Sequence, residues 1–172
     1  MKRMFIYVLH IAVILVVMTG CNQGGKSPAS GNAELATAPD FVLAGLQGDT
    51  LRLSDFQGKI VILDIWDTWC PPCQEEIPDF VELYRTYQQK NVAIIGLALG
   101  REGVGRVKSF AAEQNIPYPL AIADSAVLNA YGPIQGIPTT LIVDQNGKIV
   151  KRYTGFRTRN VFEKEIKALL SE

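Results

Sequence analysis

The residue types best suited to chemistry in this chain are concentrated in the segment DTWCPPCQEEIP, residues 67–78. Two of the three cysteines, Cys70 and Cys73, stand there with only Pro71 and Pro72 between them. Such a pair could be half of a metal site, a static disulfide, or a redox couple that opens and closes in each catalytic cycle. The other residues of the chain limit this choice.

Metal binding is the least favoured of the three. A zinc site needs about four ligands, and beyond the pair the chain offers only His10 and Cys21 as further histidine or cysteine ligands, both near the N-terminus. A copper-delivery module would need two cysteines separated by three residues and a distal histidine, and the domain has neither. We therefore expect no metal and no other cofactor, whereas a static disulfide remains compatible with an oxidising compartment.

The third cysteine, Cys21, follows a segment typical of an export signal. Lys2 and Arg3 precede an apolar run from Met4 to Met18, which is shorter than the roughly 20 residues of a full membrane span. The MTGC sequence resembles a bacterial lipobox, so Cys21 is the expected lipidation site, with an uncleaved N-terminal anchor as the alternative. Both interpretations predict an exported, membrane-anchored protein that faces the periplasm or extracytoplasmic space.

Composition divides the chain into three segments. We expect a lipoprotein-like signal peptide at 1–20, a flexible tether rich in Gly, Ser, Ala and Asn at 21–38, and one domain at 39–172. The 17 basic and 17 acidic residues leave no net charge. Without a basic stripe interleaved with aromatic residues, nucleic acid is not an expected partner.

The elements that must position the cysteines alternate between strands and helices. We expect strands at 50–56, 60–66, 92–99, 139–144 and 148–155, helices from residue 71 or 72 to 89 and at 107–114, 126–131 and 160–170, and a loop at 100–105. The β-branched run IVILDIW is typical of a strand buried on both faces, and QNG at 145–147 is typical of a hairpin turn. This order predicts an α/β sandwich with a mixed central sheet.

In this arrangement Cys70 lies where a buried strand ends and a helix begins. Unpaired N–H groups and the positive end of the helix dipole stabilise a thiolate there. Cys73 is three residues further along the same side of the helix. We therefore expect Cys70 to be exposed and nucleophilic, and Cys73 to be buried and to resolve the mixed disulfide.

These segments together resemble a known family. DIWDTWCPPCQEEIP is similar to the active-site segment of the thioredoxin superfamily, specifically of TlpA/ResA-type membrane-anchored thiol-disulfide oxidoreductases, and GIPTTLIVDQNGKIV is similar to their later segment. The resemblance implies a thioredoxin-like three-layer sandwich in which helices flank the mixed sheet, with an N-terminal strand extension. It also implies a disulfide-bearing client protein and an upstream membrane thiol reductant. Apocytochrome c is the best-known client of the family.

The resemblance also implies roles for particular residues. Pro138 matches a proline that is cis and packs beside the disulfide, and Ile137 before it pairs its backbone with substrate. Asp64 matches the buried acid beneath the second cysteine of thioredoxins, and Glu76 matches an acid of several ResA-like members. Pro78 matches a kink proline in the active-site helix.

Trp69, Pro71 and Pro72 complete the expected substrate-binding residues, together with Ile137 and Pro138. Asp64 and Glu76 are the candidate proton carriers, and Asp64 ranks first because Glu76 is expected to be better solvated. Asp67 departs from the family pattern, since many relatives carry a small neutral residue there, and this puts the usual reduction potential in doubt.

The charges near the pair favour a reductant. No Lys, Arg or His occurs between Lys59 and Arg85, whereas several acids do, among them Asp64, Asp67, Glu75 and Glu76. Only the helix start then favours the Cys70 thiolate, which suits a thiol pair recharged by another protein.

Two alternative functions remain open. A thiol peroxidase of related fold would place a Thr and an Arg around one peroxidatic cysteine, and a non-catalytic tethered binding module would keep a static disulfide.

Overall fold

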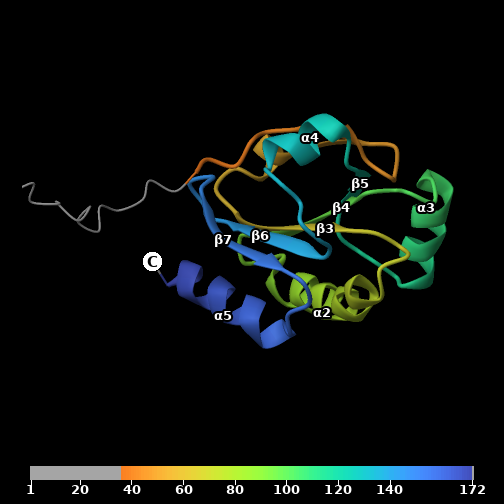
Figure 1. The fold of residues 1–172 in the computed structure, drawn as a ribbon. Coiled ribbons are helices and arrows are strands. Elements are labelled where there is room, and N and C mark those ends of the chain that lie inside the picture. Colours follow the sequence, from red (N-terminus) through yellow and green to blue (C-terminus); the bar gives the residue numbers. More distant parts are fainter. Residues whose placement is uncertain (1–35, 172) are drawn as a thin grey trace, which may run out of the picture. The chain divides into compact units, whose positions relative to one another are not determined.

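The computed structural model describes residues 36–171, and the main sheet of this domain carries five strands in the order β5-β4-β3-β6-β7. The strands are β3 (Ile60–Trp66), β4 (Val92–Ala98), β5 (Leu120–Ile122), β6 (Thr139–Val143) and β7 (Ile149–Thr154). β3, β4 and β5 are parallel, and β6 is antiparallel to both β3 and β7. The predicted mixed central sheet is confirmed, with β3 as its middle strand (Figure 1).

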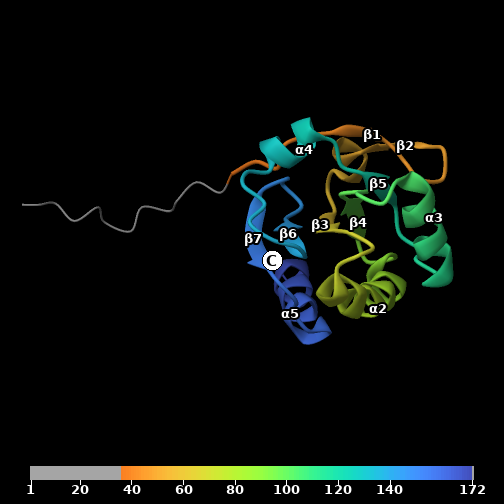
Figure 2. The ribbon, with the colours of Figure 1, turned by 45° about the vertical axis from the view of Figure 1, so that its right-hand side comes forward.

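Helices and a small hairpin cover the two faces of this sheet. The helical elements are η1 (Leu53–Phe56, a 3₁₀ turn), α2 (Pro71–Tyr87), α3 (Val104–Glu113), α4 (Ser125–Ala130) and α5 (Arg159–Leu170), and the hairpin pairs β1 (Val42–Ala44) with β2 (Thr50–Arg52). α2 and α5 lie against one face, while α4 and the hairpin lie against the other (Figures 1 and 2). The predicted three-layer α/β arrangement is therefore confirmed.

Alternation along β3 assigns its side chains to the two layers. Ile62 and Trp66 belong to the apolar cluster packed against α2 and α5, whereas Leu63 and Ile65 belong to the cluster on the opposite face. Because successive strand residues point to opposite faces, Asp64 faces the α2 side. Every residue of β3 is buried, as the β-branched run predicts.

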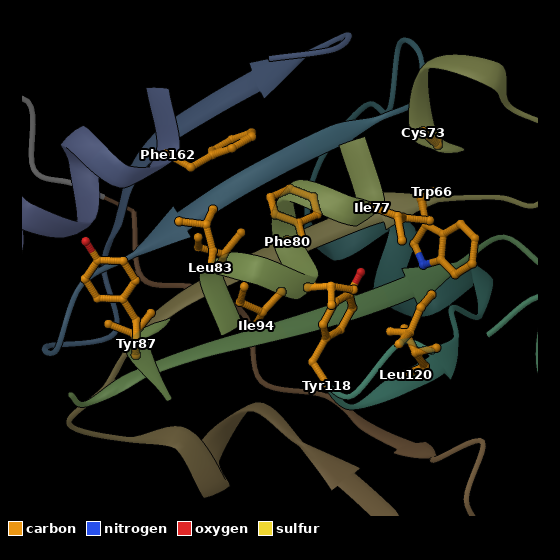
Figure 3. Packing of buried hydrophobic residues seen from close by; sticks show 14 of the residues in the cluster. Trp66, Cys73, Ile77, Phe80, Leu83, Tyr87, Ile94, Tyr118, Leu120 and Phe162 are labelled. Carbon is orange, nitrogen blue, oxygen red and sulfur yellow. The ribbon is translucent and has the colours of Figure 1, made fainter. Parts of the chain in front are cut away.

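Aromatic packing holds α2 and α5 on the sheet. The rings of Phe80 and Phe162 are 4.9 Å apart between centroids, a separation typical of favourable aromatic pairs. Figure 3 shows Cys73 and Trp66 together at one end of this cluster.

Close packing of the Leu120 side chain against β4 explains the glycine at position 96. A Cβ atom at Gly96 would lie 2.4 Å from the Leu120 Cδ2 atom.

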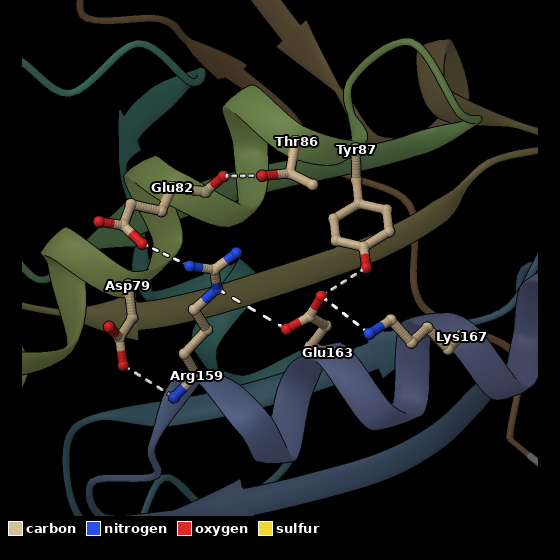
Figure 4. Close-up of polar contacts among 7 residues, drawn as sticks. All are labelled: Asp79, Glu82, Thr86, Tyr87, Arg159, Glu163 and Lys167. Atoms are coloured by element: carbon tan, nitrogen blue, oxygen red, sulfur yellow. Dashed lines mark hydrogen bonds and ion pairs between the residues drawn. The ribbon is translucent and has the colours of Figure 1, made fainter.

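Polar contacts add a second connection between α2 and α5, shown in Figure 4. The Arg159 N–H donates to Asp79 Oδ2 at 2.7 Å, and the Arg159 guanidinium pairs with Glu82 and Glu163. The Tyr87 hydroxyl donates to Glu163 at 2.7 Å. The helix that begins at the cysteine pair is thus fixed along its length.

Two predicted elements differ from the structure. Only residues 50–52 of the predicted strand 50–56 are extended, and the remainder forms η1, where the Leu53 side chain is buried. The predicted loop 100–105 ends early, because α3 begins at Val104 after Gly103, whose φ is 88°. The three-residue strand β5 was not predicted, and β1 was expected only as an N-terminal strand extension without bounds, since so short a run shows no periodicity.

Both ends of the described chain meet at the turn between β6 and β7. The Ala38 N–H donates to the Gly147 carbonyl at 2.8 Å, and the Gln145 side chain donates to the Leu169 carbonyl near the end of α5 at 3.2 Å. This turn adjoins the start of β3, because Val61 pairs with Val143. The cysteines follow the other end of β3.

The predicted signal peptide and nearly all of the predicted tether, including Cys21, lie outside the described residues. Within residues 36–171, no helix is long and apolar enough to cross a membrane.

Candidate active site

A disulfide joins Cys70 and Cys73 at the start of α2. The two sulfur atoms are 2.12 Å apart and the two Cα atoms 5.2 Å apart. Cys70 is the N-cap residue of the helix, and its Sγ accepts a hydrogen bond from the Cys73 N–H at 3.2 Å. Pro71 and Pro72 occupy the first two helical positions, where the absence of an N–H costs little. The predicted position of the pair at a strand-to-helix junction is confirmed.

The predicted exposure of Cys70 is wrong for this disulfide form. Cys70 is 2% exposed and Cys73 is 1% exposed, so both residues are buried. Part of the reason is that the Ile137 carbonyl oxygen lies 3.6 Å from Cys70 Sγ. Solvent access does not distinguish the two cysteines in this form. A difference in reactivity between them must therefore come from the position of Cys70 at the helix start.

The segment before β6 forms one wall beside the disulfide. The Ile137–Pro138 peptide bond is cis, as the resemblance implies. Pro138 is buried and Ile137 is half-buried. Directly beside Cys70 in the sequence, Trp69 is 42% exposed and Pro71 is exposed. Residues of two distant segments are thus available to a polypeptide that approaches the disulfide.

Asp64 lies on β3 beneath α2 and is 2% exposed. Among the described residues its Oδ1 atom has no hydrogen-bond partner. Burial raises the pKa of the Asp64 carboxyl well above its usual range, and the Glu76 carboxylate raises it further. An outward-facing, solvated Asp64 is excluded, and the group is a buried acid that retains its proton to higher pH.

Glu76 is also buried, at 1% exposure, which contradicts the expectation of a better-solvated side chain. The reason is its position one turn beyond Cys73, on the face of α2 that packs on the sheet. The Arg157 N–H donates to its Oε1 at 2.8 Å, while Oε2 lacks a partner within residues 36–171. Burial raises the pKa of Glu76 to about 7, although the Arg157 N–H opposes the shift.

The fold brings three further residues to this region that the sequence did not single out. Burial raises the pKa of the Tyr118 hydroxyl well above its usual range, and Asp64 and Glu76 raise it further, so this side chain lies near both acids. Arg157 reaches Glu76 from the loop after β7, and the Arg101 guanidinium stacks on the ring of Trp69. Only the fold could reveal these neighbours, because each is at least 28 residues from either active-site cysteine in sequence (101 − 73 = 28 for Arg101).

Within the described residues no group of three or more His, Cys, Asp or Glu side chains is placed to hold a metal ion.

A disulfide closed across the first turn of a helix, at the end of the middle strand of such a sheet and beside a cis-proline, defines a thiol-disulfide oxidoreductase of thioredoxin-like fold. The model of the AhpC/TSA family matches residues 35–152, and the chain belongs to this family.

Named relatives agree with this class. The chain is 40% identical over 135 residues to the thiol-disulfide oxidoreductase ResA of Geobacillus thermodenitrificans, which covers 78% of this chain and 76% of the relative. It is 34% identical to the ResA protein of Geobacillus kaustophilus, over 98% of this chain and 99% of the relative. A solved thiol:disulfide interchange protein from Chlorobium tepidum superposes with a TM-score of 0.76 at 30% identity, covering 81% of this chain and 99% of the other.

Proposed function

We propose that this protein reduces disulfides of exported client proteins through a cycle of the Cys70–Cys73 dithiol. The observation that carries the proposal is the pair at the N-cap of α2, with the Cys73 N–H aimed at Cys70 Sγ. A thiolate at Cys70 accepts this N–H and lies at the positive end of the helix dipole. Cys70 is therefore the attacking sulfur.

The cycle has two exchange steps. The Cys70 thiolate attacks one sulfur of the client disulfide, and the client disulfide breaks as a mixed disulfide forms. The released client thiolate takes up a proton. Cys73 then loses its proton and attacks Cys70 Sγ, which forms the Cys70–Cys73 disulfide and releases the second client thiol. Two electrons pass to the client, and an upstream membrane thiol reductant restores the dithiol.

Buried acidic groups without a buried cation support the proposed direction of electron flow. Among the described residues, the buried side chains of Asp, Glu, Lys and Arg type are all acidic, namely Asp64, Asp67 and Glu76. Carboxylates disfavour a nearby thiolate, and a poorly stabilised thiolate makes a dithiol a better reductant. Arg101 and Arg157 also approach the site, but neither is buried.

Asp64 and Glu76 are proposed to carry the proton that Cys73 loses. A polypeptide client would lie across Trp69, Pro71 and Pro72 on one side, and Ile137 and Pro138 on the other. A polypeptide of this kind is consistent with an apocytochrome c or with another exported disulfide protein.

The domain is expected to catalyse many turnovers of protein-disulfide reduction when a small dithiol recharges it. We expect a reduction potential close to that of reducing thioredoxins, about −270 mV, and far from the roughly −120 mV of a strong oxidant. Equilibration with glutathione or dithiothreitol buffers measures the potential, and insulin precipitation measures turnover. A pair that stays oxidised in these buffers and supports no turnover would show a static disulfide, and consumption of hydrogen peroxide in preference to disulfides would show a peroxidase.

We also propose that Cys21 carries a lipid that holds the domain at the outer side of a membrane. Cys21→Ala is expected to move the protein from the membrane fraction to the soluble fraction, or to leave an unprocessed precursor. Fractionation with mass spectrometry of the N-terminus checks this. Membrane retention of both parent and variant, with an intact N-terminus, would instead show an uncleaved anchor.

A further inference from the structure

Asp67 is a buried carboxylate that the exchange steps above do not use. The residue is 0% exposed, and it stands in the loop between β3 and α2, three residues before Cys70. A buried charge is costly unless hydrogen bonds compensate it. Asp67 Oδ1 accepts from the Thr68 N–H at 2.8 Å.

The second oxygen of Asp67 connects two loops. Oδ2 accepts from the indole Nε1–H of Trp69 at 2.8 Å and from the Arg101 N–H at 3.1 Å. Arg101 belongs to the loop between β4 and α3. The same two loops are joined again where the Thr68 hydroxyl donates to Glu102 at 2.7 Å. A small neutral residue at position 67 could make none of the side-chain bonds to Trp69 and Arg101.

These contacts fix an exposed aromatic ring beside the redox pair. Trp69 directly precedes Cys70 and is 42% exposed. The Arg101 guanidinium carbon lies 4.9 Å from the centre of its ring, within the range of a cation–π contact. The carboxylate thus holds the edge of the indole, and the guanidinium covers one face of it.

From this geometry we infer that Asp67 is a positioning residue that acts through Trp69. Together with Arg101 it fixes the indole as a docking platform for the polypeptide that flanks the client disulfide. The fixed indole favours binding of a disulfide that is carried by an extended polypeptide. A small-molecule disulfide gains nothing from it, because such a molecule reaches Cys70 without covering the indole. The inference rests on the proposed function and specifies how that site selects its substrates.

Preorganisation of the Trp69 side chain lowers the free-energy cost of binding a client. An exposed side chain that is ordered only on binding costs roughly 0.5–1.5 kcal/mol. A tryptophan held in place beforehand avoids that cost and offers a large apolar area with a polar edge. Loss of the Asp67 carboxylate should therefore weaken client binding while the thiol chemistry at Cys70 continues.

The test compares two substrates in the full-length protein. Asp67→Ala and Trp69→Ala are each assayed with a disulfide-bonded polypeptide, such as insulin, and with hydroxyethyl disulfide. We expect the ratio of the two kcat/KM values, polypeptide over small disulfide, to fall about tenfold in both variants, chiefly through a higher KM for the polypeptide. Asp55→Ala, which removes an exposed carboxylate on η1, is the control and should leave this ratio unchanged.

A spectroscopic measurement separates positioning from general damage. The chain has two tryptophans, so a ¹⁵N-labelled sample gives two indole N–H signals, and Trp69→Phe assigns them. In Asp67→Ala the Trp69 signal should move and exchange faster with solvent, while the Trp66 signal stays. Asp67→Asn keeps an oxygen acceptor and should restore part of both the signal position and the substrate ratio.

A double variant of Asp67 and Trp69, together with substitutions of two arginines, tests whether Asp67 acts through Trp69. Because Asp67 acts through Trp69, the double variant should lose no more than Trp69→Ala alone. Arg101→Ala should lower the substrate ratio, whereas Arg106→Ala, which removes a similar stacking contact on Phe110, should not. If Asp67→Ala fails to fold, Asp67→Asn and Arg101→Ala decide the question by the same ratio.

Three results would each overturn the inference: an unchanged substrate ratio in these variants, equal losses with both substrates, or additive losses in the double variant. Failure of the proposed function has a different signature, since the unaltered protein would then reduce neither substrate.

Discussion

Cys73→Ser is expected to leave the protein covalently attached to its clients, whereas Cys70→Ser should form no such adduct. The first exchange step needs only the thiolate at the helix N-cap, so the Cys73 variant can attack but cannot resolve. Both substitutions should lower multiple-turnover reduction by about 10³-fold or more, the order expected when a residue of a covalent mechanism is removed. Mixed disulfides are visible on non-reducing gels and disappear with dithiothreitol.

Alkylation of the reduced protein gives an independent check. Iodoacetamide near neutral pH should modify Cys70 well before Cys73, because only Cys70 Sγ accepts an N–H at the helix start. Mass spectrometry of the digested protein follows the two sites. Equal labelling rates, or adducts in Cys70→Ser, would contradict the assigned order of attack.

The second large effect is expected at the two buried acids. Cys73 must lose a proton inside an apolar region, where burial raises a thiol's pKa. A positioned base typically speeds such a transfer by 10²–10⁴-fold. The sequence ranked Asp64 above Glu76 on the premise that Glu76 is solvated, and the structure removes that premise. Since the pKa of Glu76 is raised to about 7, Glu76 changes charge near neutral pH and is available as a base there.

Glu76→Gln is therefore expected to slow resolution by about 10²-fold above pH 7, and Asp64→Asn by less. In the parent, the resolution rate should rise with pH through about 7, because the deprotonated carboxylate is the base. This inflection should be missing in Glu76→Gln. Stopped-flow measurement of mixed-disulfide decay against pH gives the profiles, with the exposed neighbour Glu75→Gln as matched control.

The pH dependence of folding stability gives a check on the raised pKa of Glu76 that does not depend on catalysis. A carboxyl group whose pKa is raised by folding binds its proton more tightly in the folded state, so stability falls as pH rises from about 4.5 toward 7. Denaturation of the parent should show this decline, and Glu76→Gln should reduce it.

Superimposable rate profiles for parent and Glu76→Gln in the stopped-flow experiment would remove this residue from the proton path. A larger effect of Asp64→Asn would restore the original ranking of the two acids.

The elements that determine the fold carry their own signals in the sequence. The run at 60–66 is apolar enough to predict a doubly buried strand, and the Asn-Gly turn fixes the hairpin of β6 and β7. The two cysteines with intervening prolines mark the start of α2 within one residue. Where a pattern is long or a turn residue is specific, local chemistry and tertiary structure agree.

Burial around the site could not be predicted in the same way. Glu76 sits in a polar stretch, QEEIP, and its enclosure depends on the loop after β7, whose Arg157 is 81 residues away. Likewise, a search for cations near the cysteines in sequence misses Arg101, which a different loop brings onto Trp69. Hydrogen bonds between loops leave no periodic trace, and they determine the environment of Glu76 and of Asp67.

The meeting of both chain ends at the turn between β6 and β7 has a practical consequence for immobilisation. A linker fused before residue 36 or after residue 171 would leave the domain from the end of the sheet that lies away from the cysteines. An electrode, a bead or a fluorescent protein attached there would not screen the redox pair. The domain can thus be attached through either terminus while the end of the sheet that carries the cysteine pair stays unobstructed.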